Sequence, residues 1–314
     1  MAGRKKSEGT LAAPAATAAK ALRFASSELM IGAALLLLLV TVGHFAWKKW
    51  GAPVTETEEY RVSAANIVVT PPPPWIRADV KAEAIRDGSL EGLSVLDKDL
   101  TIRVCRAFEM HAWVEKVNCV GKRPPACVSV ELTYRQPVAW VEVPAGVLPN
   151  NEVGLLPVDK AGVLLPTADF TAEQANDYPR IAVSNLTPCG MAGTPWGDPR
   201  VVVCASIAAI LAEDAKSLGL HRVLAIDSHT GTAGETLLYR VTTRKGLRLI
   251  WGSPPGRERV GEPTAAQKKV LLRQITESLA NEEPVIGADE IDLRNADGAL
   301  AAVRTARRSA NPTR

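Results

Sequence analysis

Hydrophobic residues follow three patterns along this chain. Leu29 to Trp47 form an unbroken run of 19 residues without a formally charged side chain. As a helix this run spans ~28 Å, close to the hydrocarbon thickness of a bilayer. After it, apolar residues recur every three to four positions, as in helices packed on one side, or every second position, as in half-buried strands. The sequence therefore predicts a transmembrane helix, residues 29–47, followed by an α+β part.

The first stretch of the α+β part, residues 62–134, has the predicted order βααββ. Leu100, Val104 and Phe108 are spaced by four and therefore share one face of the second helix. Pro71–Pro74 is extended polyproline, either a stiff connector or a ligand for an aromatic groove, and the adjacent strand favours the connector. The expected elements are a strand at Ile67–Val69, helices at Arg77–Arg86 and from Asp97, and strands at Val114–Val120 and Cys127–Leu132.

The second stretch, residues 135–303, predicts a mixed β-domain with two helices on an antiparallel sheet. Asp198 is an N-cap followed by proline at the first helical position, which starts a helix expected over Pro199–Leu218. Thr264 and Gln267 form the capping-box pattern of a second helix. The expected strands are Arg222–Ile226, Leu237–Val241 and Leu247–Trp251.

Charge is distributed unevenly, and this sets the expected topology. The formal net charge is +3. The basic residues gather in a tail at 1–28 and in a Pro-containing tail at 304–314 that is expected to be disordered, so the middle of the chain is slightly acidic. Nucleic acid is therefore excluded as a partner. Positive charge before the apolar run and an acidic linker at 48–61 predict an N-terminus in the cytoplasm. A cleaved signal peptide is the other interpretation, but the length of the run and its Trp-Lys-Lys-Trp flank favour an uncleaved anchor.

The sequence offers no catalytic constellation, so neither an enzyme nor a cofactor is expected. No histidine has zinc-ligand spacing, and the phosphate-loop, nucleophile-elbow and dinucleotide fingerprints are absent from the sequence. Asp227, His229 and Glu235 lie in a glycine-containing hairpin, where polar turn residues are expected without any ligand role. A nucleophile assembled from distant parts of the chain remains open at this level. Among five cysteines, Cys119 and Cys127 are the best disulfide candidates, with buried free thiols as the default alternative.

Several motifs together carry a resemblance to a known family. They are His111-Ala112-Trp113-Val114, the alternating segment Pro125–Pro137, Val158-Asp159-x-x-Gly162, Leu249–Gly252 and Ile291-Asp292-Leu293-Arg294. In this order, behind a membrane anchor, they resemble the FtsQ/DivIB family of bacterial cell-division proteins. Departures from the family pattern include the Pro71–Pro74 run in place of a glycine and Asn295 in place of an aromatic residue.

The resemblance implies a POTRA domain at 62–134, a β-domain at 135–303 and a single-pass protein of the inner membrane at the division septum. It also implies a divisome scaffold whose partners are FtsB-like and FtsL-like bitopic division proteins. The alternative is an anchored POTRA module of a protein secretion or envelope assembly system. A third hypothesis is an anchored hydrolase.

The expected partner site is the end of the β-domain. Ile291, Leu293 and Asn295 are expected on one strand face, followed by a turn at Asp297-Gly298 and a short edge segment at Leu300–Val303. An exposed edge accepts a strand from another protein, although it can also be merely tolerated. The candidate partner-binding residues are Ile291, Leu293, Arg294, Asn295, Gly298, Ala299, Leu300 and Ala302.

Overall fold

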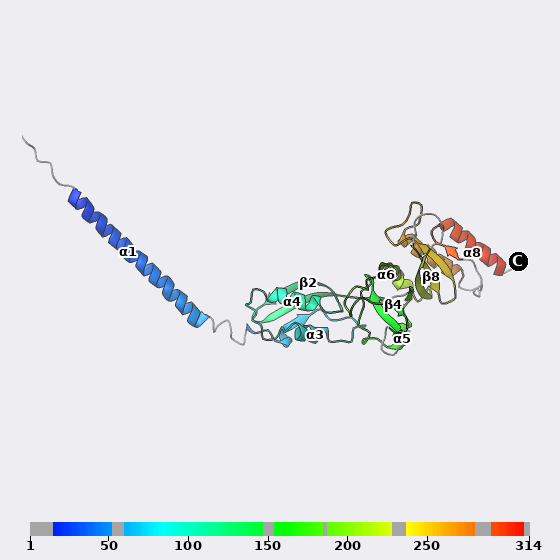
Figure 1. Ribbon diagram of the computed structural model, residues 1–314, viewed down its shortest axis with the longest axis horizontal. Coiled ribbons are helices and arrows are strands. Elements are labelled where there is room, and N and C mark those ends of the chain that lie inside the picture. The colour runs from blue at the N-terminus through cyan, green and yellow to red at the C-terminus, as the bar shows by residue number, and fades with distance from the viewer. Residues whose placement is uncertain are drawn as a thin grey trace, which may run out of the picture.

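The N-terminal helix α1 (Ala15–Ala46) is longer than the predicted transmembrane segment (Figure 1). The structure, a computed structural model, describes residues 15–51, 60–146, 154–184, 187–227, 237–279 and 290–310. The stretch Met30–Lys49 is long and apolar enough to cross a membrane. The helix includes residues 15–28 of the expected N-terminal tail, because the alanine-rich sequence there favours helix. The chain continues as a π-helical turn, Trp47–Gly51, and residues 52–59 of the expected linker lie outside the described part.

A three-stranded sheet and two helices enclose the first hydrophobic core (Figure 1). The strand order is β1-β3-β2, with β1 parallel and β2 antiparallel to β3. The predicted sequence βααββ is confirmed, and Leu100, Val104 and Phe108 are all fully buried as their spacing requires. The elements are β1 (Ile67–Val69), α3 (Val80–Asp87), α4 (Leu100–Glu109), β2 (Val114–Arg123) and β3 (Cys127–Tyr134).

The candidate disulfide between Cys119 and Cys127 in the β2–β3 hairpin is not formed. The strand register places Cys119 opposite Glu131 and Cys127 opposite Arg123, so the two cysteines are not cross-strand neighbours. All five cysteines are free thiols.

The second part of the chain forms a seven-stranded sheet with the order β10-β9-β8-β7-β6-β4-β5. It is mixed, so the expectation of an antiparallel sheet is only partly right. The pairs β4–β6, β6–β7 and β9–β10 are parallel. Parallel neighbours need a crossover, usually a helix, and crossovers are not visible in local strand patterns. The strands are β4 (Pro137–Val143), β5 (Gly154–Asp159), β6 (Arg180–Ala182), β7 (Leu220–Asp227), β8 (Leu237–Thr243), β9 (Arg248–Gly252) and β10 (Ile291–Asp292).

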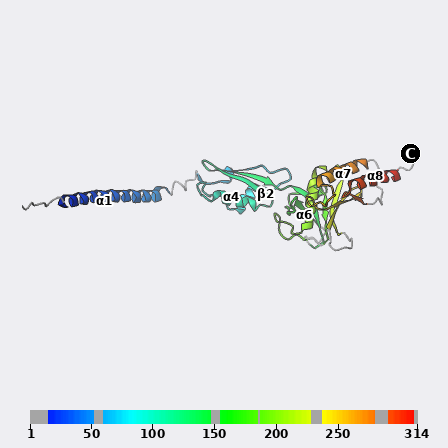
Figure 2. The ribbon, with the colours of Figure 1, turned by 90° about the horizontal axis from the view of Figure 1, so that it is seen from above.

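Helices α6 (Pro199–Leu211) and α7 (Ala265–Ser278) begin at the predicted caps. The Asp198 carboxylate accepts from the Arg200 amide, and Thr264 forms the capping box with Gln267. Helix α6 ends earlier than expected, in a 3₁₀ turn at Ala212–Asp214. It packs on β4, β5, β6 and β7 and also contacts α7, which in turn contacts the last helix, α8 (Figure 2). A short helix, α5 (Ala172–Ala175), precedes β6.

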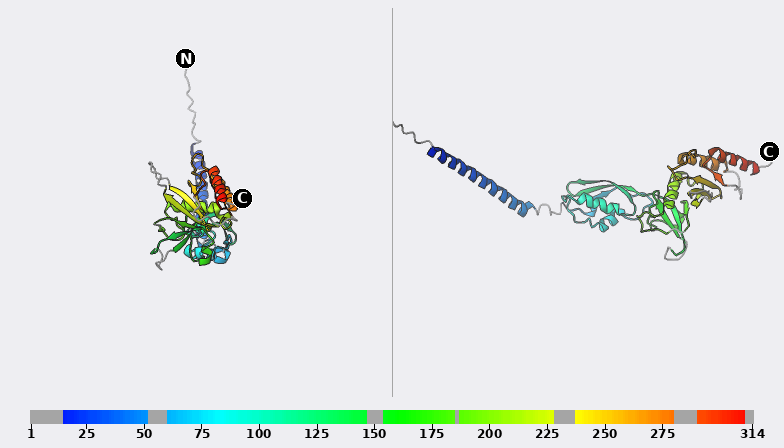
Figure 3. Two further views of the ribbon diagram at one scale, coloured as in Figure 1. Left: turned by 90° about the vertical axis from the view of Figure 1, so that its right-hand side faces the viewer. Right: turned by 45° about the horizontal axis from the view of Figure 1, so that its top comes forward.

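Helix α8 (Ala296–Ala310) overturns two expectations, the edge segment at Leu300–Val303 and a disordered tail beginning at 304. The chain turns before residue 296, and the Asn295 side chain accepts a hydrogen bond from the Gly298 amide at 3.1 Å. Alanine and arginine favour helix, and Ala299 and Val303 are buried one turn apart. A third helix therefore joins the two predicted ones at the end of the sheet away from β4 and β5 (Figure 3).

Asp169 joins the first core to the second sheet. Its buried carboxylate accepts hydrogen bonds from the backbone amides of Arg77 (3.0 Å) and Ala78 (2.8 Å), and from the indole N–H of Trp113 (2.6 Å). The neighbouring Phe170 ring lies 5.9 Å from Trp113 and 5.2 Å from Trp140 of β4. The full burial of Trp113, which the sequence places at a helix-to-strand step, therefore depends on residues of both stretches.

Candidate functional site

The predicted partner-binding residues all lie in what we call the β10 corner, residues 290–303. Three of them face the core, with exposed fractions of 4% for Ile291, 0% for Leu293 and 1% for Ala299. These side chains support the corner and are not presented to a partner. Arg294 and Leu300 are half-buried, and the exposed members of the set are Asn295, Gly298 and Ala302.

The backbone of β10 has one hydrogen-bonding side that is not used by β9. The Leu293 N–H donates to the Ile250 carbonyl of β9 at 3.0 Å. Because successive residues of a strand direct their N–H and C=O groups to opposite sides, those of Asp292 point away from β9. Among the described residues β10 is the last strand of the sheet. The corner therefore offers a donor and an acceptor at a sheet edge.

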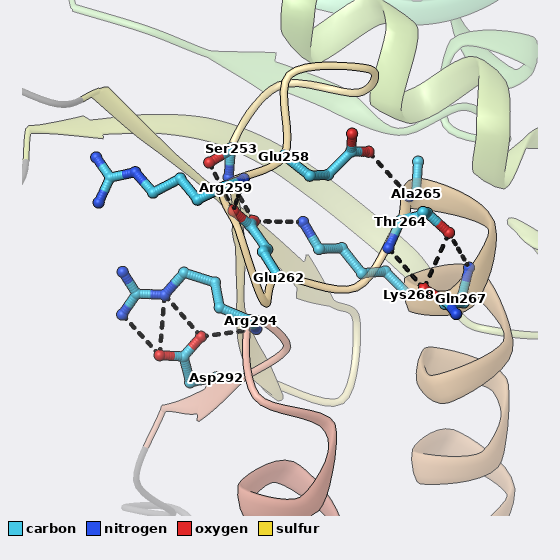
Figure 4. Close-up of polar contacts among 10 residues, drawn as sticks. All are labelled: Ser253, Glu258, Arg259, Glu262, Thr264, Ala265, Gln267, Lys268, Asp292 and Arg294. Carbon is cyan, nitrogen blue, oxygen red and sulfur yellow. Dashed lines mark hydrogen bonds and ion pairs between the residues drawn. The ribbon is translucent and has the colours of Figure 1, made fainter.

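Asp292 and Arg294 form a clamp at the end of β10 (Figure 4). The Arg294 Nε donates to Oδ1 at 2.9 Å and Nη2 to Oδ2 at 2.6 Å, and the Arg294 backbone N–H also bonds Oδ1 at 2.9 Å. Burial opposes ionisation of Asp292, but these bonds outweigh it and lower the pKa of its carboxyl. A Cβ at Gly252 would lie 2.6 Å from Arg294 Cγ, so the arginine stem crosses the backbone of β9 where only glycine leaves room.

A buried ion pair lies on the same side of Gly252 as the Arg294 stem, where an added Cβ would also meet Glu262 Oε1 (Figure 4). The Lys268 ammonium, fully buried, donates to the Glu262 carboxylate at 2.6 Å. The same carboxylate accepts from the Ser253 hydroxyl at 2.7 Å and from the Arg259 amide at 3.1 Å. Burial opposes ionisation of Glu262, but the hydrogen bonds from Lys268, Ser253 and Arg259 together lower the pKa of its carboxyl to about 2.

Trp251 completes the base of the corner. Its ring is fully buried, and the Lys268 ammonium lies 5.3 Å from the ring centroid, within the range of a cation–π contact. Lys268 thus ties α7, the 253–264 loop and the end of β9 together. A surface built on such contacts is preorganised, which reduces the cost of ordering when a partner binds.

The described residues with catalytic potential lie apart from one another. In the described part of the chain no group of three His, Cys, Asp or Glu side chains is placed to hold a metal ion. His111 contacts Glu83 at 3.0 Å, a pair on the surface of the first core. Of the hairpin set, His229 and Glu235 lie outside the described residues. The expectation of a non-enzymatic protein stays a prediction.

Sequence reasoning missed the two carboxylates that organise the structure, Glu262 and Asp169. Both stand in polar surroundings in the sequence, where a carboxylate is normally solvated. The sequence did indicate a buried carboxylate near α7. Lys268 lies on a helix whose other inward positions are apolar, and a buried cation needs an anionic partner such as Glu262.

No protein-family model matches the sequence, and no curated protein is significantly similar to it.

Proposed function

We propose that this chain is a non-enzymatic scaffold of bacterial cell division. Helix α1 anchors it in the inner membrane with the N-terminus in the cytoplasm, and the two sheets stand in the periplasm at the division septum. The first core, in this proposal, is a POTRA domain and the seven-stranded part a β-domain. FtsB-like and FtsL-like bitopic proteins are the partners.

The observation that carries the proposal is that β10, among the described strands, lies at the edge of the sheet on a base of buried contacts. Strand addition to a sheet edge supplies affinity through backbone hydrogen bonds and specificity through neighbouring side chains. The outward N–H and C=O of Asp292 can form such backbone hydrogen bonds. The exposed residues Asn295 and Ala302, which follow in the chain, can supply the specificity. The apolar stretch Met30–Lys49, together with the motif order of the two sheets, supports an anchored scaffold.

The test isolates the backbone of β10. Asp292→Pro removes the outward N–H together with the carboxylate, and proline is tolerated in edge strands. Asp292→Asn is the matched control, because it keeps the N–H and an oxygen that accepts from Arg294. We expect the proline variant of the full chain to capture at least tenfold less FtsB-like protein, whereas the asparagine variant captures about as much as the wild type.

Equal capture by both variants would reject the β10 site. The division function is tested separately by the position of a fluorescent fusion, which should gather at midcell. A fusion spread evenly around the envelope would instead favour an anchored module of a secretion or envelope assembly system.

A further inference from the structure

A polar pocket of about 230 Å³ lies at the end of the second sheet where β6 and β7 begin and β8 ends. It is lined by Asn176, Tyr178, Arg180, His221 and Arg244. Drug-sized ligands occupy ~300–1,000 Å³, so this pocket suits a smaller ligand. It is separate from the β10 corner, and nothing in the proposed scaffold function uses it.

Asn176 orients both arginines of the pocket. Its side-chain oxygen accepts from Arg180 Nη2 at 3.3 Å, and its backbone carbonyl accepts from Arg244 Nη2. Both guanidinium groups are thereby held at one rim of the pocket by a neutral residue, with further N–H donors left for a ligand.

Among the described residues, the arginines around the pocket outnumber the carboxylates that pair with them. Glu142 is shared, at 2.8 Å from Arg222 and 3.6 Å from Arg180. Among the described residues no carboxylate lies within 4.0 Å of a nitrogen of Arg244. The nearby ion pair of Lys216 with Asp177, at 3.4 Å, has no net charge. Three arginines against one carboxylate leave an excess of two positive charges, which matches a phosphate dianion better than a single carboxylate.

His221 is the extra residue of a β-bulge, because the β7–β8 register shifts between Leu220 and Arg222. A bulge re-aims a side chain, here into the pocket. Burial and the nearby Arg222, Arg180 and Arg244 lower the pKa of its imidazole, while Glu142 of β4 acts in the opposite direction. A neutral imidazole donates one N–H and accepts a proton when an anion enters.

We propose that this pocket binds a phosphate group, held by Arg180 and Arg244 with His221 and Tyr178 as further donors. The group belongs either to a small soluble phosphoester or to a phosphomonoester lipid headgroup. The four donor-bearing side chains that line the pocket come from the segment before β6, from β6, from β7 and from the residue after β8, and together they suit the several oxygens of a phosphate.

The test uses the full chain in nanodiscs of zwitterionic lipid and phosphate-free buffer, titrated with inorganic phosphate by calorimetry. We expect saturable binding at one site, weakened at least tenfold by Arg180→Gln and by Arg244→Gln. Arg103→Gln, an exposed arginine on α4, is the control of equal charge and should bind like the wild type. Arg244 is exposed, so its variant keeps the fold, and unchanged hydrogen exchange in β7 and β8 checks this.

A second readout is the imidazole NMR signal of His221. Phosphate should raise the pKa of His221 in the wild type and leave it unchanged in Arg244→Gln. Absence of saturable binding, wild-type affinity in Arg244→Gln, or an equal loss in Arg103→Gln would each overturn the proposal. Competition by glycerol 3-phosphate but not by phosphatidic acid vesicles identifies a soluble ligand, and the reverse pattern identifies a lipid headgroup.

Discussion

Replacing Asp169 by alanine tests whether one carboxylate couples the first hydrophobic core to the second sheet. The change leaves three N–H groups without their acceptor, those of Arg77, Ala78 and the Trp113 indole. Hydrogen bonds to a charged acceptor contribute ~1.5–3 kcal/mol each. Loss of the buried indole hydrogen bond should cost about 2 kcal/mol. Loss of each amide hydrogen bond should cost only ~0.5–1 kcal/mol, because these part-buried amides can bind water instead.

The expected destabilisation is therefore about 3–4 kcal/mol, a factor of several hundred in the local opening equilibrium. Hydrogen exchange of the full chain in nanodiscs measures this opening in peptides from α3 and β2. Asp87→Ala is the control, because Asp87 is 67% exposed and its change should cost under ~0.5 kcal/mol.

A double-mutant cycle isolates the indole bond. Trp113→Phe keeps an aromatic ring but removes the donor to Asp169. The two changes together should cost ~1–2 kcal/mol less than the sum of the single changes, because the bond can be lost only once. Additive effects, or exchange in Asp169→Ala that accelerates less than tenfold, would refute the coupling.

Three further predictions concern the ion pair and the membrane topology. Lys268→Met leaves the buried Glu262 carboxylate without its cation and should lower the free energy of unfolding by ~3–5 kcal/mol, measured by thermal or denaturant unfolding. Adding Glu262→Gln to the same chain should restore part of this stability. If it restores none, the loss comes from packing and not from charge. The folded pKa of Glu262 is lowered from 4.5 to about 2, so its contribution, of order 3 kcal/mol, is fully present above pH ~4.5 and lost as the pH falls toward 2. Faster exchange of the 253–264 loop over that interval in the wild type, but not in Glu262→Gln, measures it, and identical pH profiles would contradict it. A periplasm-dependent reporter should be active when fused after Arg314 and inactive when fused before Arg4, and the opposite pattern would reverse the topology.

Local signals predicted the elements that local physics determines. The apolar spacing of α4 and the capping box of α7 gave the correct helices, because the same residues that carry the pattern form the contacts. Helix α8 was missed because Asp297-Gly298 has the composition of a turn, and because the short side chains of Ala299, Ala301 and Ala302 carry little periodic signal.

Contacts between distant segments could not be predicted in this way. Asp169 lies 56 residues from Trp113 in the sequence, and nothing near it indicates a buried indole partner. The parallel pairing of β9 with β10 likewise depends on the chain passing through α7 before it returns to the sheet. The candidate partner-binding residues lie together in the β10 corner, but which of them are buried depends on where the strand stops.

Helix α6 has a mechanical consequence for the second sheet. The strand β6 is three residues long and pairs with β4 through only two of them. Among the described strands, β6 alone connects the β4–β5 hairpin to the β7–β8–β9 meander within the sheet. Under the proposed function, a tensile load between a membrane anchor and a partner at β10 would cross this seam, where only two residue pairs join β4 to β6, as few as join β9 to β10. Helix α6 packs on β4, β5, β6 and β7 together. It therefore bridges the β4–β6 junction from one face of the sheet and resists separation of the two halves under load.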